Sequence, residues 1–274
     1  MKTKKKKERK APFYQNPATL AVYLVLRALV IFSLVRAALR WDFQSVFLCS
    51  LTLILMILPS IFTRRLSIEL PTTLEIIILL FIFSAEILGE LNSFYIRVPH
   101  WDTVLHTLNG FLCAAVGFAL VDMLNRSDRF SFRLSPHYLA LVAFCFSMTV
   151  GVMWEFFEYG GDRFLGLDMQ KDTVIHALRT VELDPTRSNK VIAVRDIQEV
   201  ILVHSDGTQQ VLGLGGYLDV GLHDTMKDLI VNFIGAAVFS VIGFFYVKAK
   251  GQGRFAARFI PRVLRTEQAQ KKDI

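Results

Sequence analysis

The sequence lacks the short motifs that identify most soluble enzymes. It contains no glycine-rich phosphate loop, no Rossmann glycine run, no Gly-x-Ser-x-Gly elbow and no His-Glu-x-x-His zinc-protease helix. Soluble-type nucleotide chemistry is therefore not indicated. Only three cysteines occur, Cys49, Cys113 and Cys145, and each falls inside an apolar run without pairing or metal-type spacing. We interpret them as small core hydrophobes that carry no information about the redox compartment.

Apolar residues are abundant instead. They make up 53% of the 274 positions and include 23 phenylalanines, more than a soluble domain needs to fill its core. Much of this chain must therefore lie in lipid. The net charge of +7 comes from basic residues gathered at both ends of the chain and not on one face of a domain. This distribution argues against nucleic acid as a partner and predicts basic cytoplasmic tails that contact membrane lipids.

Apolar runs of about 20 residues, the length that crosses a bilayer, predict about six transmembrane helices in an all-α integral membrane helix bundle. They cover residues 18–39, 44–62, 72–91, 101–123, 137–159 and 221–247. Basic residues in the 63–70 and 124–135 connections and in the tails 1–17 and 248–274 put both termini in the cytoplasm. The first run is too long for a cleaved signal peptide. We expect a multi-pass protein of the cell membrane.

One long segment, 160–220, lies between the fifth and sixth predicted helices, on the extracytoplasmic side by this topology. Its stretches 191–197 and 200–214 are rich in β-branched residues, and the Asp206-Gly207 pair supplies the positive φ that a tight turn needs. A small β-hairpin is predicted. About 60 residues bury little core alone, so we expect this segment to lie on the helix bundle.

The predicted helices carry ionisable residues in pairs, and inside a membrane such residues usually face the bundle interior or a water-filled cavity. Spacings of three or four positions put both members of a pair on one helical face. The pairs are Glu86 and Glu90, Asp102 and His106, Glu155 and Glu158 with Asp162 one turn beyond, and Asp224 and Asp228. At about 1.5 Å of rise per residue they converge in the outer third of the membrane, so we interpret them as one site.

Carboxylates and an imidazole contributed by several helices are typical of metal-binding bundles. Such a mixture suits zinc, manganese or iron, whereas carboxylates alone suit magnesium or calcium. The predicted ligands are Asp102, His106, Glu155, Glu158, Asp224 and Asp228, with Glu86, Glu90 and Asp162 as secondary candidates. Glu158 is also the candidate general base. The alternative interpretation is structural: the acids are protonated, solvated, or paired with Arg97, Arg163, Lys171 or Lys227.

Three segments of the chain form an ordered set: Trp101–His106 followed by Gly110, Glu155–Glu158, and Asp224–Asp228 followed by Gly235. In these segments the chain resembles the YjdF-type family of uncharacterised bacterial inner-membrane proteins, with its Asp-x-x-x-His-x-x-x-Gly, Glu-x-x-Glu and Asp-x-x-x-Asp segments. The resemblance implies a multi-helix inner-membrane protein and selects the pairs of the last three helices. It implies no particular activity. The long 160–220 segment departs from the compact connection of that family.

Three functions fit these features. The first is a metal-dependent hydrolase or transferase that acts on a lipid or lipid-linked envelope substrate from the outer face. The second is a cation- or proton-coupled transporter that uses the same acids, although the sequence shows no internal repeat of the kind many transporters have. The third is a membrane scaffold or assembly protein that meets a partner through the hairpin. The sequence leaves the choice between them, and the substrate, open.

Overall fold

The computed structural model describes residues 16–61, 68–125, 134–251, 254–260 and 262–263. Most of the predicted basic tails, and the arginines of the 63–70 and 124–135 connections, lie outside the described residues. The chain divides into a larger unit, Met1–Val150 with Val231–Ile274, and a smaller unit, Gly151–Ile230. The division falls inside α7 (Pro136–Leu165) and α8 (Leu222–Lys248), each of which is one uninterrupted helix.

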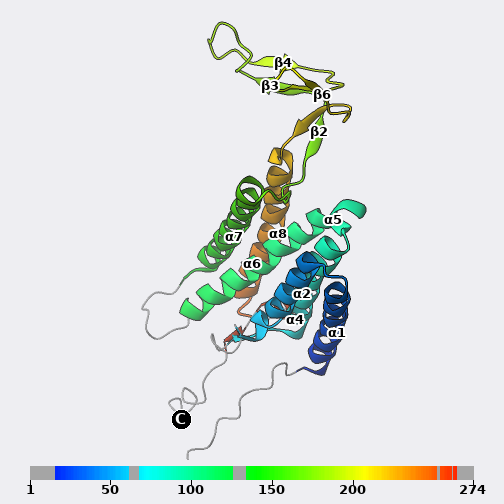
Figure 1. Cartoon of the computed structure of the whole chain (residues 1–274). Helices are drawn as coiled ribbons and strands as arrows, with labels where there is room; N and C mark the ends of the chain where they lie inside the picture. The colour runs from blue at the N-terminus through cyan, green and yellow to red at the C-terminus, as the bar shows by residue number, and fades with distance from the viewer. Residues whose placement is uncertain (1–15, 62–67, 126–133, 252–253, 261, 264–274) are drawn as a thin grey trace, which may run out of the picture. The chain divides into compact units, whose positions relative to one another are not determined.

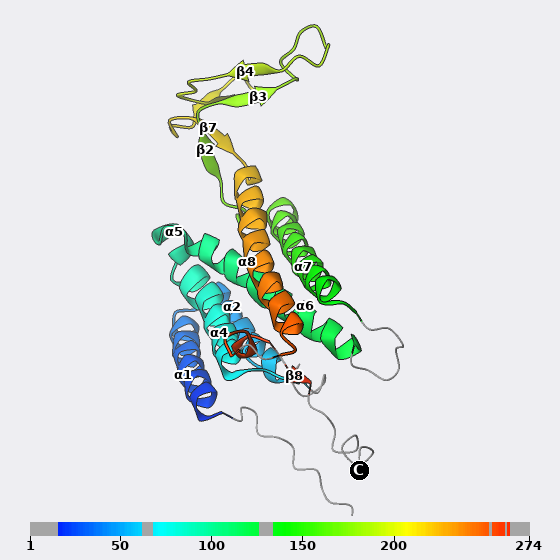
Figure 2. The same cartoon turned by 180° about the vertical axis from the view of Figure 1, so that it is seen from behind.

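Polar caps begin the first two helices of the larger unit. The side chain of Asn16 accepts a hydrogen bond from a backbone N–H in the first turn of α1 (Pro17–Leu39). Asp42 does the same for α2 (Phe43–Leu55). Each cap satisfies a donor that the helix itself leaves without a partner. Helices α1, α2 and α4 (Thr72–Phe83) pack side by side, as both views of the molecule show (Figure 1, Figure 2).

Helices long enough to cross a membrane dominate the described residues. Five qualify by length and hydropathy: Pro17–Leu39, Phe43–Ile61, Trp101–Asp122, Pro136–Leu165 and Leu222–Lys248. The other predicted helix, 72–91, is present as α4 continued without a break by a π-helix, η1 (Ser84–Leu91). The predicted fold class, a helical membrane bundle with a small β-hairpin insertion, is confirmed.

Helix α6 (Trp101–Asn125), which follows the short α5 (Phe94–Arg97), makes backbone contact with α8 in the larger unit. A Cβ added at Gly110 would lie 2.1 Å from the carbonyl oxygen of Asn232. One added at Gly235 would lie 1.9 Å from the carbonyl oxygen of Thr107. Only hydrogen fits at these two positions, so both glycines permit the close packing of the two helices.

Aromatic rings fill the interior of the larger unit next to this crossing. Phe118 and Phe239 are at most 1% exposed, and their ring centroids lie 6.0 Å apart. Phe111 meets Phe239 edge to face at 5.1 Å. Edge-to-face pairs of this kind are the favoured arrangement of buried aromatic rings. They lock α6 against α8 beyond the glycine contact.

Residues after α8 return to the bundle. Ala256, in the 3-10 helix η2 (Ala256–Arg258), and Ile260 are buried in the same core as the phenylalanine rings. Strand β8 (Arg262–Val263) pairs antiparallel with β1 (Ile68–Glu69). The charge pattern alone predicts a basic tail here. Apolar side chains placed between the basic ones explain why this part packs on the helices.

The smaller unit, described throughout, holds the end of α7, the start of α8 and three antiparallel strand pairs. These are β2 (Thr173–Ile175) with β7 (Tyr217–Asp219), β3 (Leu178–Thr180) with β4 (Ile192–Val194), and β5 (Ile201–Val203) with β6 (Gln209–Val211). The predicted hairpin is the β5–β6 pair, with Gly207 at a φ of 82° in its turn. The other predicted strand, 191–197, contains β4, which lies beside β3 (Figure 1).

Candidate functional site

Asp102 and His106 contact each other one turn apart near the start of α6. Nε2 of His106 lies 3.3 Å from Oδ1 of Asp102, and their side chains are 13% and 22% exposed respectively. The i, i+4 spacing produces this contact because both residues lie on a regular α-helix. The predicted pair of this helix is therefore a close ion pair when the imidazole is protonated.

A layer of buried and half-buried polar groups follows directly after this pair. The side-chain amide of Asn109 donates to Oδ1 of Asn232 at 3.3 Å, and Asn232 is 1% exposed. Nδ2 of Asn232 lies 3.7 Å from the sulfur of Met148, and the hydroxyl of Ser147 donates to the carbonyl oxygen of Gly110 at 2.7 Å. These bonds join α6, α7 and α8 of the larger unit.

Neither Asn109 nor Ser147 is among the predicted site residues. For Asn109 a signal exists, because it follows His106 by three positions and so continues the polar face of α6. For Ser147 the sequence offers no such signal, since its partner is a backbone carbonyl that is 37 positions away.

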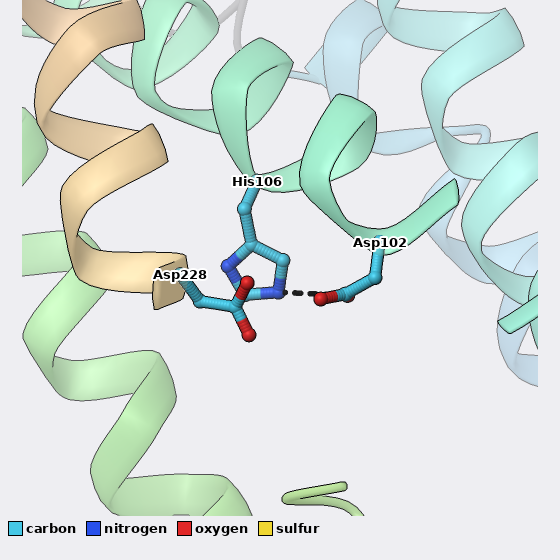
Figure 3. Close-up of side chains that lie close together, drawn as sticks. All are labelled: Asp102, His106 and Asp228. Atoms are coloured by element: carbon cyan, nitrogen blue, oxygen red, sulfur yellow. Dashed lines mark ion pairs between the residues drawn. The ribbon is translucent and has the colours of Figure 1, made fainter. Parts of the chain in front are cut away.

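Asp228 precedes Asn232 by one turn on α8 and is 1% exposed. Because α8 is uninterrupted, helix geometry puts Asp228 on the face that carries Asn232. One ligand atom from each of Asp102, His106 and Asp228 lies within 4.8 Å of the other two. Figure 3 shows the carboxylate of Asp228 beside the imidazole ring and the dashed ion pair to Asp102. Of the predicted ligands, these three come together.

The spacing of the three groups suits a small divalent ion. Bonds from zinc to imidazole nitrogen or carboxylate oxygen are about 2.0–2.2 Å long, so two ligand atoms of one ion lie at most about 4.4 Å apart. The 3.3 Å between His106 and Asp102 is within this limit. The other atom pairs of the group lie within 4.8 Å, which exceeds this limit by at most about 0.4 Å. Three protein ligands would leave room for water or substrate, as catalytic zinc sites do.

Two other predicted ligands hold local structure. Asp224 accepts a hydrogen bond from the N–H of Lys171 at 2.8 Å and lies 3.6 Å from the ammonium of Lys227. The same ammonium lies 3.8 Å from Asp228. Asp162 accepts from two successive backbone N–H groups beyond the end of α7, at 2.6 and 2.9 Å. The pairing of Asp224 with Lys227 matches the structural interpretation, whereas the backbone contacts of Asp162 are a structural role that it does not include.

The remaining predicted ligands lie outside the three-residue group. Glu155 and Glu158 are 4% and 8% exposed on α7, and the indole N–H of Trp154 donates to Oε1 of Glu158 at 2.8 Å. Glu86 and Glu90 lie on the π-helix η1, whose wider winding changes the face that an i, i+4 pair shares. Glu90 is exposed and Glu86 is half-buried. The ligand roles of these four residues stay predictions.

The spanning helices and the polar groups buried between them define a polytopic membrane protein. The chain matches the family described as "Predicted membrane protein (DUF2238)" over residues 18–249, and it belongs to that family. The predicted resemblance to an uncharacterised bacterial membrane family of the YjdF type is confirmed.

A relative that the chain resembles is itself described as uncharacterized. A protein of Thermotoga maritima, described as an uncharacterized protein, is 23% identical over 107 residues, which are 39% of this chain and 53% of that protein. The chain thus spans about half the length of this relative. No solved structure matches the chain. The comparisons give the family and the membrane class but no activity.

Proposed function

We propose that this chain is a metal-dependent hydrolase or transferase of the cell membrane that acts on a lipid or lipid-linked envelope substrate. The observation that carries the proposal is the grouping of Asp102, His106 and Asp228 within 4.8 Å. Two carboxylates and an imidazole suit zinc, manganese or iron better than magnesium, which prefers oxygen ligands alone. A divalent ion held there would activate water or polarise a phosphoryl or acyl oxygen.

The charge balance of the group favours a cation. Asp228 is 1% exposed, and removing a carboxylate from water is costly unless the charge is paired. The Lys227 ammonium, 3.8 Å from Asp228, offsets part of this charge, but Asp224 shares it at 3.6 Å. Asp102 adds a second negative charge beside His106. A divalent ion held among these carboxylates would lower the cost of burying their charge.

The chain's own residues supply orientation and a base. Asp102 lies against Nε2 of His106, so it would either bind the ion beside this nitrogen or, if the ion is held by Nδ1, restrain the ring from the other side. Glu158 is the candidate general base. Its Oε1 accepts the indole N–H of Trp154, which fixes the carboxylate as a proton acceptor requires.

The depth of the group supports a substrate that arrives from the membrane. Asp102 and His106 lie in the first two turns of a membrane-spanning helix, where head groups meet hydrocarbon. The basic residues of the sequence favour cytoplasmic termini, which would put this end of α6 at the outer face. Lipids and lipid-linked precursors present their reactive bonds at this level.

Elemental analysis of protein purified without chelator tests the proposal. We expect about one equivalent of a transition metal in the parent and none in His106→Ala or Asp228→Asn. His204→Ala is the matched control, because this exposed histidine lies outside the group and its variant should keep the metal. Glu155→Gln tests separately whether that predicted ligand contributes. A well-folded parent without metal would overturn the proposal.

A cation- or proton-coupled carrier is the second candidate. The observation that favours it is the amide pair of half-buried Asn109 and buried Asn232, which extends the polar face of α6 beyond His106. Against it, Ala256 and Ile260 are buried in the core at the end of the larger unit where α4 begins and α8 ends. Apolar packing therefore occupies the end through which a transported ion would have to leave. An ion flux in proteoliposomes that Asn232→Leu abolishes would favour the carrier over the enzyme.

A further inference from the structure

An apolar groove lies between α4 and α6 in the larger unit. Its volume is about 300 Å³, at the small end of the range for ligand pockets. Apolar side chains from both helices line it: Ile77, Leu80 and Phe81 of α4, and Val104, Leu105 and Leu108 of α6. Ser84 and Trp101 complete the lining and are the residues there with polar side-chain atoms. The groove therefore suits an apolar ligand with a polar group at one place.

The groove is continuous with the apolar outside of the spanning helices. Val104 is 59% exposed and Leu80 is 44% exposed, so the rim of the groove is open. Farther along α6, Val116 is 38% exposed on the same membrane-spanning helix. In a bilayer such side chains contact acyl chains, and an apolar cavity does not hold ordered water. The occupant that the surroundings supply is an acyl chain.

Trp101 gives the groove a single unsatisfied donor. Its Nε1 is shielded from solvent and has no hydrogen-bond acceptor among the described residues. The ring is held edge to face against Phe94, with centroids 5.1 Å apart. A buried N–H without an acceptor destabilises the protein, and an ester carbonyl oxygen of a lipid would accept it. This donor lies at the start of α6, one residue before Asp102.

The residues that line the groove and the candidate metal ligands Asp102 and His106 occupy neighbouring stripes of α6. Trp101, Leu105 and Leu108 repeat at helical spacing, and so do Asp102 and His106. Successive residues of an α-helix are about 100° apart, so the second stripe follows directly round the helix from the first. A chain lying in the groove with its ester at Trp101 would therefore present its head group at the level of Asp102.

We propose that this groove binds one acyl chain of the substrate, which is an acylated membrane lipid whose ester carbonyl accepts the Trp101 N–H. This inference rests on the proposed function for the reaction at Asp102 and His106, but it concerns a separate binding site. It assigns the substrate class: a glycerophospholipid or another acyl lipid, and not a soluble metabolite.

Photolabelling of the purified protein in bilayer nanodiscs tests it, with phosphatidylglycerol carrying a diazirine on one acyl chain as the probe. We expect mass spectrometry to find the label concentrated in 77–84 and 101–108. Val104→Trp fills the rim of the groove and should reduce this labelling several-fold. Val116→Trp is the matched control, because it enlarges an exposed valine of the same helix away from the groove. Equal labelling of all lipid-exposed helix faces, unaffected by Val104→Trp, would overturn the proposal.

Two further variants and the metal content of each sample separate the possible outcomes. Ser84→Phe fills the groove from the wall opposite Val104. If both Val104→Trp and Ser84→Phe lose labelling, misfolding of a single variant does not explain the loss. Trp101→Phe keeps the ring and removes the N–H, and should weaken labelling without abolishing it. Metal content is measured on the same samples: metal without groove labelling overturns the lipid site alone, and groove labelling without metal supports the lipid site while it overturns the enzyme.

Discussion

Gly110 of α6 lies so close to Asn232 of α8 that a Cβ on the glycine would be 2.1 Å from the asparagine carbonyl oxygen. This contact fixes the position of α6 along the axis of α8. His106 stands one turn before Gly110, and Asp228 stands one turn before Asn232. The grouping of the histidine and the aspartate therefore depends on a position where only hydrogen fits.

Gly110→Ala should destabilise the protein and reduce metal binding together. Overpacking a tight interior usually costs about 1–3 kcal/mol, and the upper end is expected here because the obstacle is backbone. Thermal unfolding in detergent, followed by tryptophan fluorescence, measures the change. Gly160→Ala on α7 is the control, since its nearest heavy atom would be 4.0 Å away and alanine favours the helix. Equal stability of the two variants would contradict the packing argument.

Asp102→Asn should lower zinc affinity roughly 10–100-fold whether Asp102 binds the ion or restrains His106. Competition with a chromogenic chelator measures this affinity. For the parent, affinity should also fall as pH drops, because protons compete with the metal for the imidazole. Asp162→Asn, which alters a carboxylate bound to backbone N–H groups, is the control. Unchanged affinity in Asp102→Asn would remove this residue from the site.

Asn109 and Asn232 should show strong coupling. Asn232→Leu leaves the half-buried Asn109 amide without its partner at 3.3 Å, and the cost should lie near the lower end of the about 1–3 kcal/mol of an unsatisfied buried group. Asn109→Leu does the same in reverse. The double variant should be more stable than the sum of the single changes predicts, because it removes both polar groups at once. Additive losses in unfolding free energy would show that the two amides act independently.

The sequence predicts the parts of this molecule that local chemistry controls. A bilayer requires long apolar helices, so the spans are visible as apolar runs. The Asp102 and His106 contact follows from i, i+4 spacing within one helix, and the β5–β6 turn follows from Asp206 and Gly207. Each of these features is decided by residues fewer than about 25 positions apart.

Other parts depend on contacts between distant segments. Asn109 meets Asn232 across 123 positions, and no periodicity predicts that pairing. The antiparallel pairing of β1 with β8 joins two strands of two residues each, too short for a pattern to predict. The π-helix η1 also escapes prediction, because its residue types do not distinguish it from an α-helix and only its hydrogen-bond register differs.

The turn between β3 and β4 should be sensitive to acid. Asp184 accepts hydrogen bonds from the hydroxyl of Thr186 at 2.6 Å and from the N–H groups of Thr186, Ser188 and Lys190 at 2.9–3.0 Å. The Thr186 hydroxyl bond holds the pKa of Asp184 below its ordinary value of 3.8, partial burial opposes this, and the N–H bonds reinforce it. A lowered pKa in the folded state stabilises the turn above the ordinary value, and this stability is lost as pH falls below it.

Hydrogen exchange of residues 184–190, corrected for the intrinsic rate, checks this expectation in the parent between neutral pH and about pH 3. Protection should be constant down to about pH 4 and then fall, because below the ordinary pKa of the carboxyl the opened turn takes up a proton that the folded turn does not, which favours the open state. Asp184→Asn should show weak protection at every pH. The exposed Asp196→Asn, in the loop after β4, should behave like the parent. If the parent kept full protection at the lowest pH, the carboxylate would not be what orders this turn.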